Sequence, residues 1–240
     1  MKKLNYHINP TLDQRATIGM VVLSEDETVE YEMRQLIPEP DVALHVSRVN
    51  SGEELTPDTI MQMKSDLAAA ASLFPRSANF DCVAYACTSG TSMIGATAVH
   101  GQVAAACQTK AVTDPLTALI AYCRQARIKR LGFLSPYRAD VSDSLRANLS
   151  KAGIETPGFG YFGEQRESAV VRIDKQSIEV ASREIVATGD MQALFLSCTN
   201  LRTHSLLKQL GQELGMPIIS SNAVLAWHMR VLLQLGADSF

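Results

Sequence analysis

Apolar residues occur along the chain in two alternating patterns. Short continuous apolar runs predict strands near residues 18–23, 43–49, 82–86, 102–106, 130–134, 193–197 and 217–220. Between several of these runs, apolar residues recur every three or four positions, which is the spacing of an amphipathic helix. Brief apolar strands separated by helices are typical of parallel strands buried under helices, so the pattern predicts an α/β fold.

Several helices have end signals in the sequence. The sequence TPD at 56–58 offers an N-cap threonine, a proline at the first helical position and an acid at the positive end of the helix dipole. It predicts a helix that runs to about Phe74. Two later helical patterns are followed by Gly153 and Gly215, and glycine suits the position just after a helix.

Two segments of the chain resemble each other. The segments DCVAYACTSGTS at 81–92 and QALFLSCTNLRT at 192–203 are each an apolar strand ending in Cys-Thr, followed by small or polar residues. Nearly the same offset relates Gly19 to Gly132, which lie in two earlier apolar runs. The alternative is a chance resemblance, because few residues are identical between the segments.

The repeat predicts two pseudo-symmetric halves, each a short, mostly parallel sheet flanked by helices. The first half is expected to span residues 1–112 and the second 113–221. The last helical stretch, within 222–240, is expected to pack back on the first half.

Composition excludes several classes of protein. The net charge of −3 argues against a basic face for nucleic acid, and no apolar run is long enough for a membrane helix. The N-terminal residues lack the apolar stretch of a signal peptide. Five cysteines without a C-x-x-C pair indicate neither a disulfide framework nor a zinc site, and the histidines show no metal-ligand spacing. A reduced, cytoplasmic protein is the simplest interpretation.

Two of the cysteines are candidates for chemistry. Cys87 and Cys198 each end a predicted parallel strand, and ligands of open α/β sheets bind at that end of the strands. Two halves related by a pseudo-twofold axis would bring both thiols to one cleft, where they could act on opposite faces of a planar carbon or as nucleophile and acid. Nearby N–H groups and hydroxyls would lower a thiol pKa and hold a carboxylate. The alternative is two buried cysteines without chemistry.

Three stretches resemble the Asp/Glu racemase superfamily, in its branch of maleate cis-trans isomerases and arylmalonate decarboxylases. They are VAYACTSGTS at 83–92, LFLSCTNLRT at 194–203 and LSPYRADV at 134–141. The resemblance implies two pseudo-symmetric α/β halves, no metal or organic cofactor, and a homodimer or larger homo-oligomer. It also implies Cys87 and Cys198 as catalytic thiols and Tyr137 as a group that binds or protonates a carboxylate. The substrate contacts that it implies are Thr88, Ser89, Thr199 and Asn200.

The sequence departs from maleate isomerases at two loops. Those enzymes carry asparagine where this chain has Asp26, and again where it has Glu167 or Ser168. An ionised Asp26 would repel a dicarboxylate and suit a substrate with a cationic nitrogen. The pattern L-S-x-D-x-T at 23–28 resembles proteins of ectoine and hydroxyectoine utilisation, whose substrates are cyclic amidines with one carboxylate. The alternative is that Asp26 only caps a helix beginning near Thr28.

These observations favour a cofactor-independent isomerase that acts on a small carboxylic acid with two cysteines, either by racemisation or by cis-trans isomerisation. An arylmalonate-type decarboxylase and a non-catalytic binding protein are the alternatives. A dinucleotide site is not expected, because no G-x-G-x-x-G follows a strand. The residues leave open which thiol is the base and which the acid.

Overall fold

Two four-stranded sheets form the centre of the protein in the computed structural model, which describes residues 1–9 and 12–236. The first sheet has the order β2-β1-β3-β4 and the second β6-β5-β7-β8, and every pairing is parallel. The strands are β1 (Ala16–Leu23), β2 (Val42–Val49), β3 (Cys82–Ala86), β4 (Val112–Thr113), β5 (Leu131–Ser135), β6 (Phe159–Tyr161), β7 (Ala193–Leu196) and β8 (Ile218–Ser220). This arrangement confirms the α/β fold with two similar, mostly parallel sheets.

Register shows how closely the two sheets correspond. Gly19 of β1 lies opposite Val83 of β3, and Gly132 of β5 lies opposite Leu194 of β7. Val83 and Leu194 each come four residues before a cysteine of the repeated Cys-Thr pair. The offset seen in the sequence therefore reflects the same strand order and the same register.

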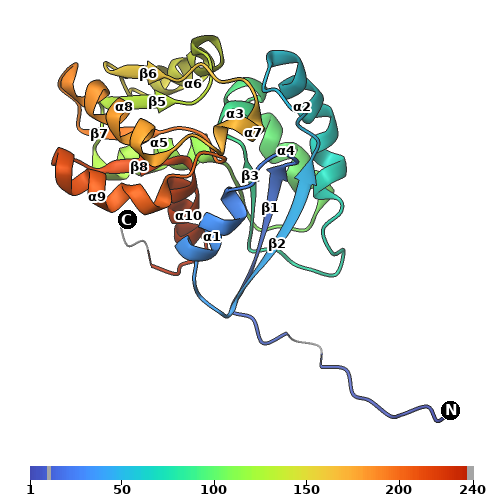
Figure 1. Ribbon diagram of the computed structural model, residues 1–240. Helices are drawn as coiled ribbons and strands as arrows, with labels where there is room; N and C mark the ends of the chain where they lie inside the picture. Colours follow the sequence, from blue (N-terminus) through green and yellow to red (C-terminus); the bar gives the residue numbers. More distant parts are fainter. Residues whose placement is uncertain (10–11, 237–240) are drawn as a thin grey trace.

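Helices flank both sheets (Figure 1). They are α1 (Val29–Leu36), α2 (Pro57–Ala71), α3 (Thr88–Ile94), α4 (Ala96–Ala106), α5 (Pro115–Ala126), α6 (Ala139–Lys151), α7 (Glu167–Val170), α8 (Lys175–Ala187), α9 (His204–Leu214) and α10 (Ser221–Leu232). The expected start of α2 is confirmed, since the Thr56 hydroxyl accepts the N–H of Thr59 at 3.2 Å. Gly153 and Gly215 follow α6 and α9 with positive φ angles, as helix-ending residues do.

One expected strand is wrong. Residues 102–106 belong to α4, and the strand of this region is the short β4 further along the chain. The misassigned run contains three consecutive alanines, and alanine has the highest intrinsic helix propensity. Short apolar runs of this kind fit a buried helix as well as a strand.

The last helix contacts both halves of the molecule. Leu225 and Met229 of α10 pack with residues of β1 and β3. Val224 and Trp227 on another face of α10 pack with α5. The predicted boundaries at 112 and 221 stay predictions, and residues 237–240 of the expected last helix lie outside the described residues.

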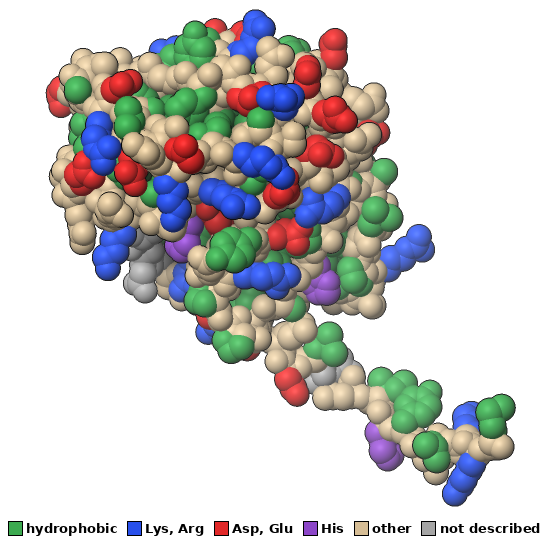
Figure 2. All heavy atoms as spheres, viewed as in Figure 1, with side chains coloured by type: hydrophobic (Ala, Val, Ile, Leu, Met, Phe, Trp, Pro, Cys, Tyr) green, Lys and Arg blue, Asp and Glu red, His purple; other side chains and the backbone are tan. Residues whose placement is uncertain are grey.

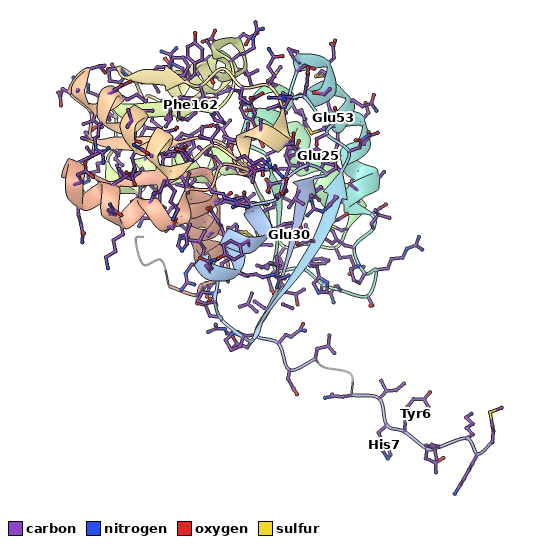
Figure 3. The ribbon with its side chains drawn as sticks, in the orientation of Figure 1. Tyr6, His7, Glu25, Glu30, Glu53 and Phe162 are labelled. Atoms are coloured by element: carbon purple, nitrogen blue, oxygen red, sulfur yellow. The ribbon has the colours of Figure 1, made fainter. Side chains whose placement is uncertain are left out.

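The surface carries both signs of charge. Lys and Arg side chains lie among Asp and Glu side chains over the face shown in Figure 2, in keeping with the small net charge. Residues 1–9 are exposed and extend away from the body, with Tyr6 and His7 on this segment (Figure 3). In the described part of the chain, none of the helices combines the length and the apolar character that crossing a membrane requires.

Candidate active site

Cys87 lies at the carboxyl end of β3 and is the N-cap residue of α3. Its side chain is buried, and its Sγ accepts the N–H of Gly90 at 3.2 Å. The hydroxyl of Tyr85, two residues earlier, donates to the Met63 thioether at 3.7 Å and lowers the pKa of this thiol. A Cβ at Gly90 would lie 2.5 Å from the Tyr85 hydroxyl and 2.9 Å from the Cys87 sulfur. Only glycine leaves room for both this thiol and the Tyr85 hydroxyl.

Cys198 follows β7 at the corresponding place in the second sheet. Its Sγ accepts the N–H of Asn200 at 3.3 Å and lies 2.9 Å from the hydroxyl oxygen of Tyr137. Unlike Cys87, it has a backbone φ of 98°. A residue other than glycine in that region stores about 1–3 kcal/mol of strain, which persists where the surrounding structure enforces it. The main-chain N–H of Cys198 is held by the Ser221 hydroxyl at 3.0 Å.

Hydrogen bonds join the two cysteine loops directly. The hydroxyl of Thr199 donates to the carbonyl of Ala86 at 3.2 Å, so the residue after one cysteine contacts the residue before the other. The hydroxyl of Thr88 donates at 2.8 Å to Ser221, which also accepts the N–H of Cys198. The structure therefore brings both thiols to one buried place between the halves.

The remaining expected substrate contacts are also at this place. Thr88, Ser89, Tyr137 and Thr199 are all buried. Ser89 lies in the first turn of α3, and its carbonyl accepts the Ser92 hydroxyl at 2.9 Å. Hydroxyl groups and strand-end N–H groups of this kind can bind a carboxylate.

The two carboxylate oxygens of Asp26, in the loop after β1, have different surroundings. Its Oδ1 accepts the N–H groups of Thr28 and Val29, both at 2.8 Å, and so caps the start of α1. Among the described residues, its buried Oδ2 finds no hydrogen-bond partner. Burial raises the pKa of this carboxyl, while the two N–H bonds, the Thr199 hydroxyl and Arg48 favour the charged form. Capping alone does not account for the free oxygen.

Glu167 is the second buried carboxyl of the site, at the start of α7. Its Oε1 accepts the Tyr137 hydroxyl at 2.5 Å, and its Oε2 accepts the side-chain amide of Asn200 at 3.0 Å. Burial raises its pKa; the bonds from Tyr137 and Asn200 oppose that effect, and the charges of Asp26 and Glu25 add to it. From the sequence, this position was expected only to differ from that of maleate isomerases, and no role was predicted for it.

Two loops of the first half hold Glu167 and Asn200 in place. In the loop after β2, the carbonyl of Glu53 accepts the N–H of Glu167 at 3.1 Å, and Glu54 forms an antiparallel bridge with Arg166. In the loop after β1, the carbonyl of Glu25 accepts the Asn200 side-chain amide at 3.4 Å. Both loops can be followed in Figure 3, where Glu25 and Glu53 are labelled.

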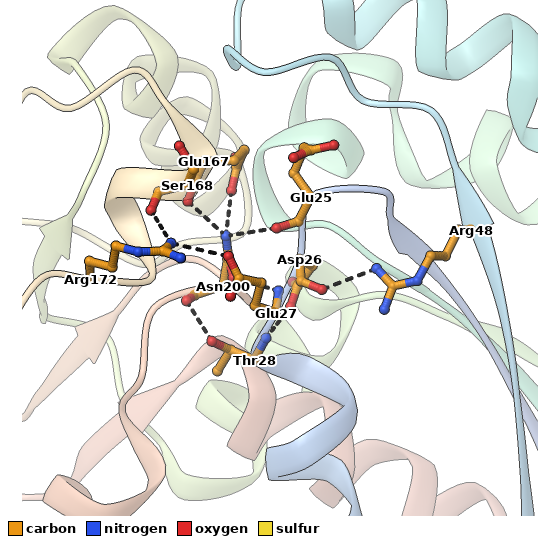
Figure 4. A network of polar contacts seen from close by, with 9 residues as sticks. All are labelled: Glu25, Asp26, Glu27, Thr28, Arg48, Glu167, Ser168, Arg172 and Asn200. Atoms are coloured by element: carbon orange, nitrogen blue, oxygen red, sulfur yellow. Dashed lines mark hydrogen bonds and ion pairs between the residues drawn. The ribbon is translucent and has the colours of Figure 1, made fainter.

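Asn200 is the centre of the polar network in Figure 4. Its side-chain oxygen accepts the N–H of Glu27 at 2.9 Å, and its carbonyl accepts the Thr28 hydroxyl at 2.8 Å. Its side-chain amide donates to the carbonyl of Glu167 at 3.1 Å as well as to the carboxylate. In this conformation the side chain expected to contact substrate ties the two halves together instead.

Both thiols are held in their protonated form at neutral pH. Burial raises the pKa of Cys87 to about 12; the Gly90 N–H and Tyr85 hydroxyl oppose the rise, and the charges of Glu167 and Asp26 add to it. Burial likewise raises the pKa of Cys198 well above its usual range, again with contributions from Glu167 and Asp26. That each thiol responds to the same two carboxyls is a second sign that both face one site.

Three residues of the site were not predicted as site residues: Tyr85, Glu167 and Ser221. Tyr85 has a sequence signal, since it is a phenol within an otherwise apolar buried strand. Ser221 follows β8, the neighbour of β7, at the same edge of the sheet. Within residues 1–9 and 12–236, no group of three or more His, Cys, Asp or Glu side chains is placed to hold a metal ion.

Known proteins share this fold. The maleate isomerase Iso of Pseudomonas putida S16, in a mutant form with maleate, superposes with a TM-score of 0.80 over 91% of this chain and 92% of that chain, at 21% identity. A mutant Nocardia farcinica maleate cis-trans isomerase with a covalently bound succinylcysteine intermediate gives a TM-score of 0.81 over 91% and 93%, at 20% identity. At these identities the likeness shows the fold.

Sequence comparison gives a narrower relationship. Arylmalonate decarboxylase of Bordetella bronchiseptica is 26% identical over 128 residues, 53% of each protein, so the match spans about half the length of that relative. The profile of the arylmalonate decarboxylase family matches residues 43–239, which include both cysteines, Tyr137 and Glu167. This protein therefore belongs to the arylmalonate decarboxylase family.

Proposed function

We propose that the protein is a cofactor-independent isomerase of a small carboxylic acid, working with Cys87 and Cys198. The observation that carries the proposal is the meeting of these two buried thiols, from corresponding strand ends, at one site. Each sulfur accepts a main-chain N–H, and such bonds favour its thiolate form. A binding protein has no need for two thiols arranged in this way.

Two reaction courses fit a thiol pair. In a racemisation or epimerisation, one thiolate removes the proton from the carbon next to the carboxylate and the other thiol delivers a proton to the opposite face. In a cis-trans isomerisation, a thiolate adds to the double bond, the new single bond rotates, and the thiolate leaves again. The succinylcysteine found in the Nocardia enzyme supports the chemical competence of cysteine in this fold.

For the substrate, we propose one carboxylate together with a cationic nitrogen. Asp26 and Glu167 are both buried, and the Oδ2 of Asp26 has no hydrogen-bond partner in the part of the chain that the structure describes. Two like unit charges 4 Å apart repel by about 4 kcal/mol at an effective dielectric constant of about 20, and opposite charges attract by the same amount. A cyclic amidine acid such as ectoine or hydroxyectoine has this charge pattern, whereas maleate brings a second negative charge.

Proton exchange in heavy water tests this proposal. Aspartate, glutamate, maleate, phenylmalonate, ectoine and hydroxyectoine are incubated with the protein and followed by NMR. We expect isomerisation, or deuterium entry next to the carboxylate, with an amidine acid. Cys87→Ser and Cys198→Ser should each abolish isomerisation, while Cys123→Ala, in the apolar contacts of α5, should retain it. Equal activity of all variants, or no reaction with any compound, would contradict the two-thiol isomerase.

Decarboxylation is the second candidate, because the family profile is that of arylmalonate decarboxylase. It needs protonation from one face only, and therefore one thiol. Release of carbon dioxide from phenylmalonate that persists in Cys87→Ser and stops in Cys198→Ser would favour it over isomerisation.

A further inference from the structure

The hydroxyl of Tyr137 lies between a thiol and a carboxylate. It is 2.9 Å from the sulfur of Cys198 and donates to Oε1 of Glu167 at 2.5 Å. A phenol has one proton to donate, so while it donates to Glu167 its oxygen can only accept from Cys198. The three groups thus form a directed chain, from the S–H of Cys198 through the O–H of Tyr137 to the carboxylate of Glu167.

We propose that Glu167 is the internal proton acceptor for Cys198, acting through Tyr137, and that Cys198 is therefore the base of the pair. The S–H bond breaks and its proton passes to the Tyr137 oxygen, while the phenolic proton passes to Oε1 of Glu167. The negative charge moves from carboxylate to sulfur, and no proton enters or leaves the site. The assignment of Cys198 as base rests on the proposed two-thiol function; the proton chain itself does not.

Electrostatics favour this route over loss of a proton to solvent. Direct ionisation of Cys198 would add a negative charge beside Asp26 and Glu167, which both raise its pKa. Proton transfer along the Cys198–Tyr137–Glu167 chain adds no net charge to the site, because Glu167 becomes neutral as the sulfur becomes charged. Burial, Asp26 and Glu25 raise the pKa of Glu167 toward that of a group able to hold a proton, against the opposing effect of its two hydrogen bonds. Tyr137 and Asn200 are its hydrogen-bond donors.

Cys87 has a different arrangement in the described residues. Its phenol, Tyr85, comes from the same strand, lowers the pKa of the thiol, and donates its one proton to the thioether of Met63 at 3.7 Å. A thioether is a weak hydrogen-bond acceptor and does not take up a proton at ordinary pH. Tyr85 can therefore stabilise a Cys87 thiolate but cannot relay its proton to a base, which suits the acid of the pair.

Alkylation measured separately at each cysteine tests the proton chain from Cys198 to Glu167 without any substrate. The full-length protein is treated with iodoacetamide between pH 6 and 10, and modification of Cys87 and Cys198 is followed separately by peptide mass spectrometry. A thiol that ionises directly reacts about tenfold faster per pH unit below its pKa. A thiol that passes its proton to an ionised Glu167 forms thiolate in a share that pH does not change. We expect the alkylation rate of Cys198 to include a pH range in which it does not change. The alkylation rate of Cys87 should rise continuously with pH.

Substitutions then separate a proton acceptor from a structural residue. Glu167→Gln should remove the pH-independent range and lower the alkylation rate of Cys198 at pH 7 by about tenfold or more. The alkylation rate of Cys87 should increase, because a charge that raises the pKa of this thiol is lost. Tyr137→Phe should remove the pH-independent range of Cys198 and leave the alkylation rate of Cys87 unchanged. Glu167→Asp should keep the pH-independent range, with a lower alkylation rate of Cys198. Circular dichroism and melting curves check folding, and Tyr137→Phe serves if Glu167→Gln does not fold.

The result that overturns the inference is a wild-type Cys198 rate that rises tenfold per pH unit throughout. The inference would also be overturned if Glu167→Gln changed the alkylation rates of both thiols in the same direction. Because these outcomes are read without substrate, they are independent of whether the proposed isomerase activity is found.

Discussion

The two cysteine loops occupy equivalent places in the two sheets but differ in backbone and in surroundings. Cys87 has a relaxed extended backbone with φ −146°, whereas Cys198 has φ 98°. Cys87 has a phenol from its own strand, while Cys198 has one from the loop after β5, backed by a carboxylate. Pseudo-symmetry thus places the two thiols, and local departures from it make them chemically unequal.

The largest effect expected from this inequality is on catalysis. Loss of a general acid or base typically costs about 10²–10⁴-fold. Cys87→Ser should lose inversion by that amount but retain exchange of the substrate proton in heavy water, because the base remains. Cys198→Ser should lose both, as measured by NMR with a chiral solvating agent. If Cys87→Ser loses exchange while Cys198→Ser keeps it, the roles of the two thiols are reversed.

Neutralising Asp26 should affect both thiols alike. Asp26→Asn keeps the Oδ1 acceptor that caps α1 and removes a charge that raises the pKa of both cysteines. Alkylation of each should therefore become faster, about tenfold for each pKa unit lost. A response of one thiol alone would show that Asp26 faces only that cysteine.

The same substitution has a pH-dependent effect on stability. The pKa of Asp26 is higher in the folded protein than its usual value, so the stabilising contribution of its protonated form is lost as pH rises through that pKa. Asp26→Asn should raise the melting temperature at pH 7 more than at pH 4. An equal change at both pH values would show that Asp26 titrates in the folded state as it does in the unfolded chain.

Crowding around Cys87 gives a smaller effect that is specific to the first half. Gly90→Ala would push a Cβ into the Tyr85 hydroxyl and the Cys87 sulfur, and overpacking of this kind costs about 1–3 kcal/mol. The melting temperature should fall by several degrees, and alkylation of Cys87 should change while that of Cys198 does not. Gly101→Ala in α4 is the matched control, because its Cβ meets open space and should stabilise the helix slightly.

The smallest effect concerns the backbone alone. Cys198→Gly should be more stable than Cys198→Ala by about 1 kcal/mol, because glycine tolerates a positive φ that alanine does not. At Cys87, which has an extended backbone and is an N-cap, glycine should be preferred over alanine by only a few tenths of a kcal/mol, roughly. Calorimetry on the four variants measures the two differences, and an equal preference for glycine at both positions would refute the contrast in strain.

Much of the framework could be predicted from local sequence. Apolar runs located most strands, and the repeated Cys-Thr segments predicted two matching sheets with Cys87 and Cys198 at equivalent ends. Helix capping by Asp26, which the sequence offered as the alternative to substrate binding, could be recognised from its place before Thr28, because capping involves only neighbouring residues. The prediction of Tyr137 as a site residue depended on the family resemblance. The run at 102–106 failed because an alanine-rich segment does not distinguish a strand from a helix by periodicity.

Only the tertiary structure decided how the two thiols differ. Glu167, Tyr137 and Cys198 come from three separate segments, and Ser221 joins the cysteine loops from a fourth. The positive φ of Cys198 is likewise a feature of the folded structure, in which Tyr137, Asn200 and Ser221 contact this residue. Local patterns report propensity and burial, whereas the direction of a proton chain depends on which distant side chains meet and on how much water they exclude.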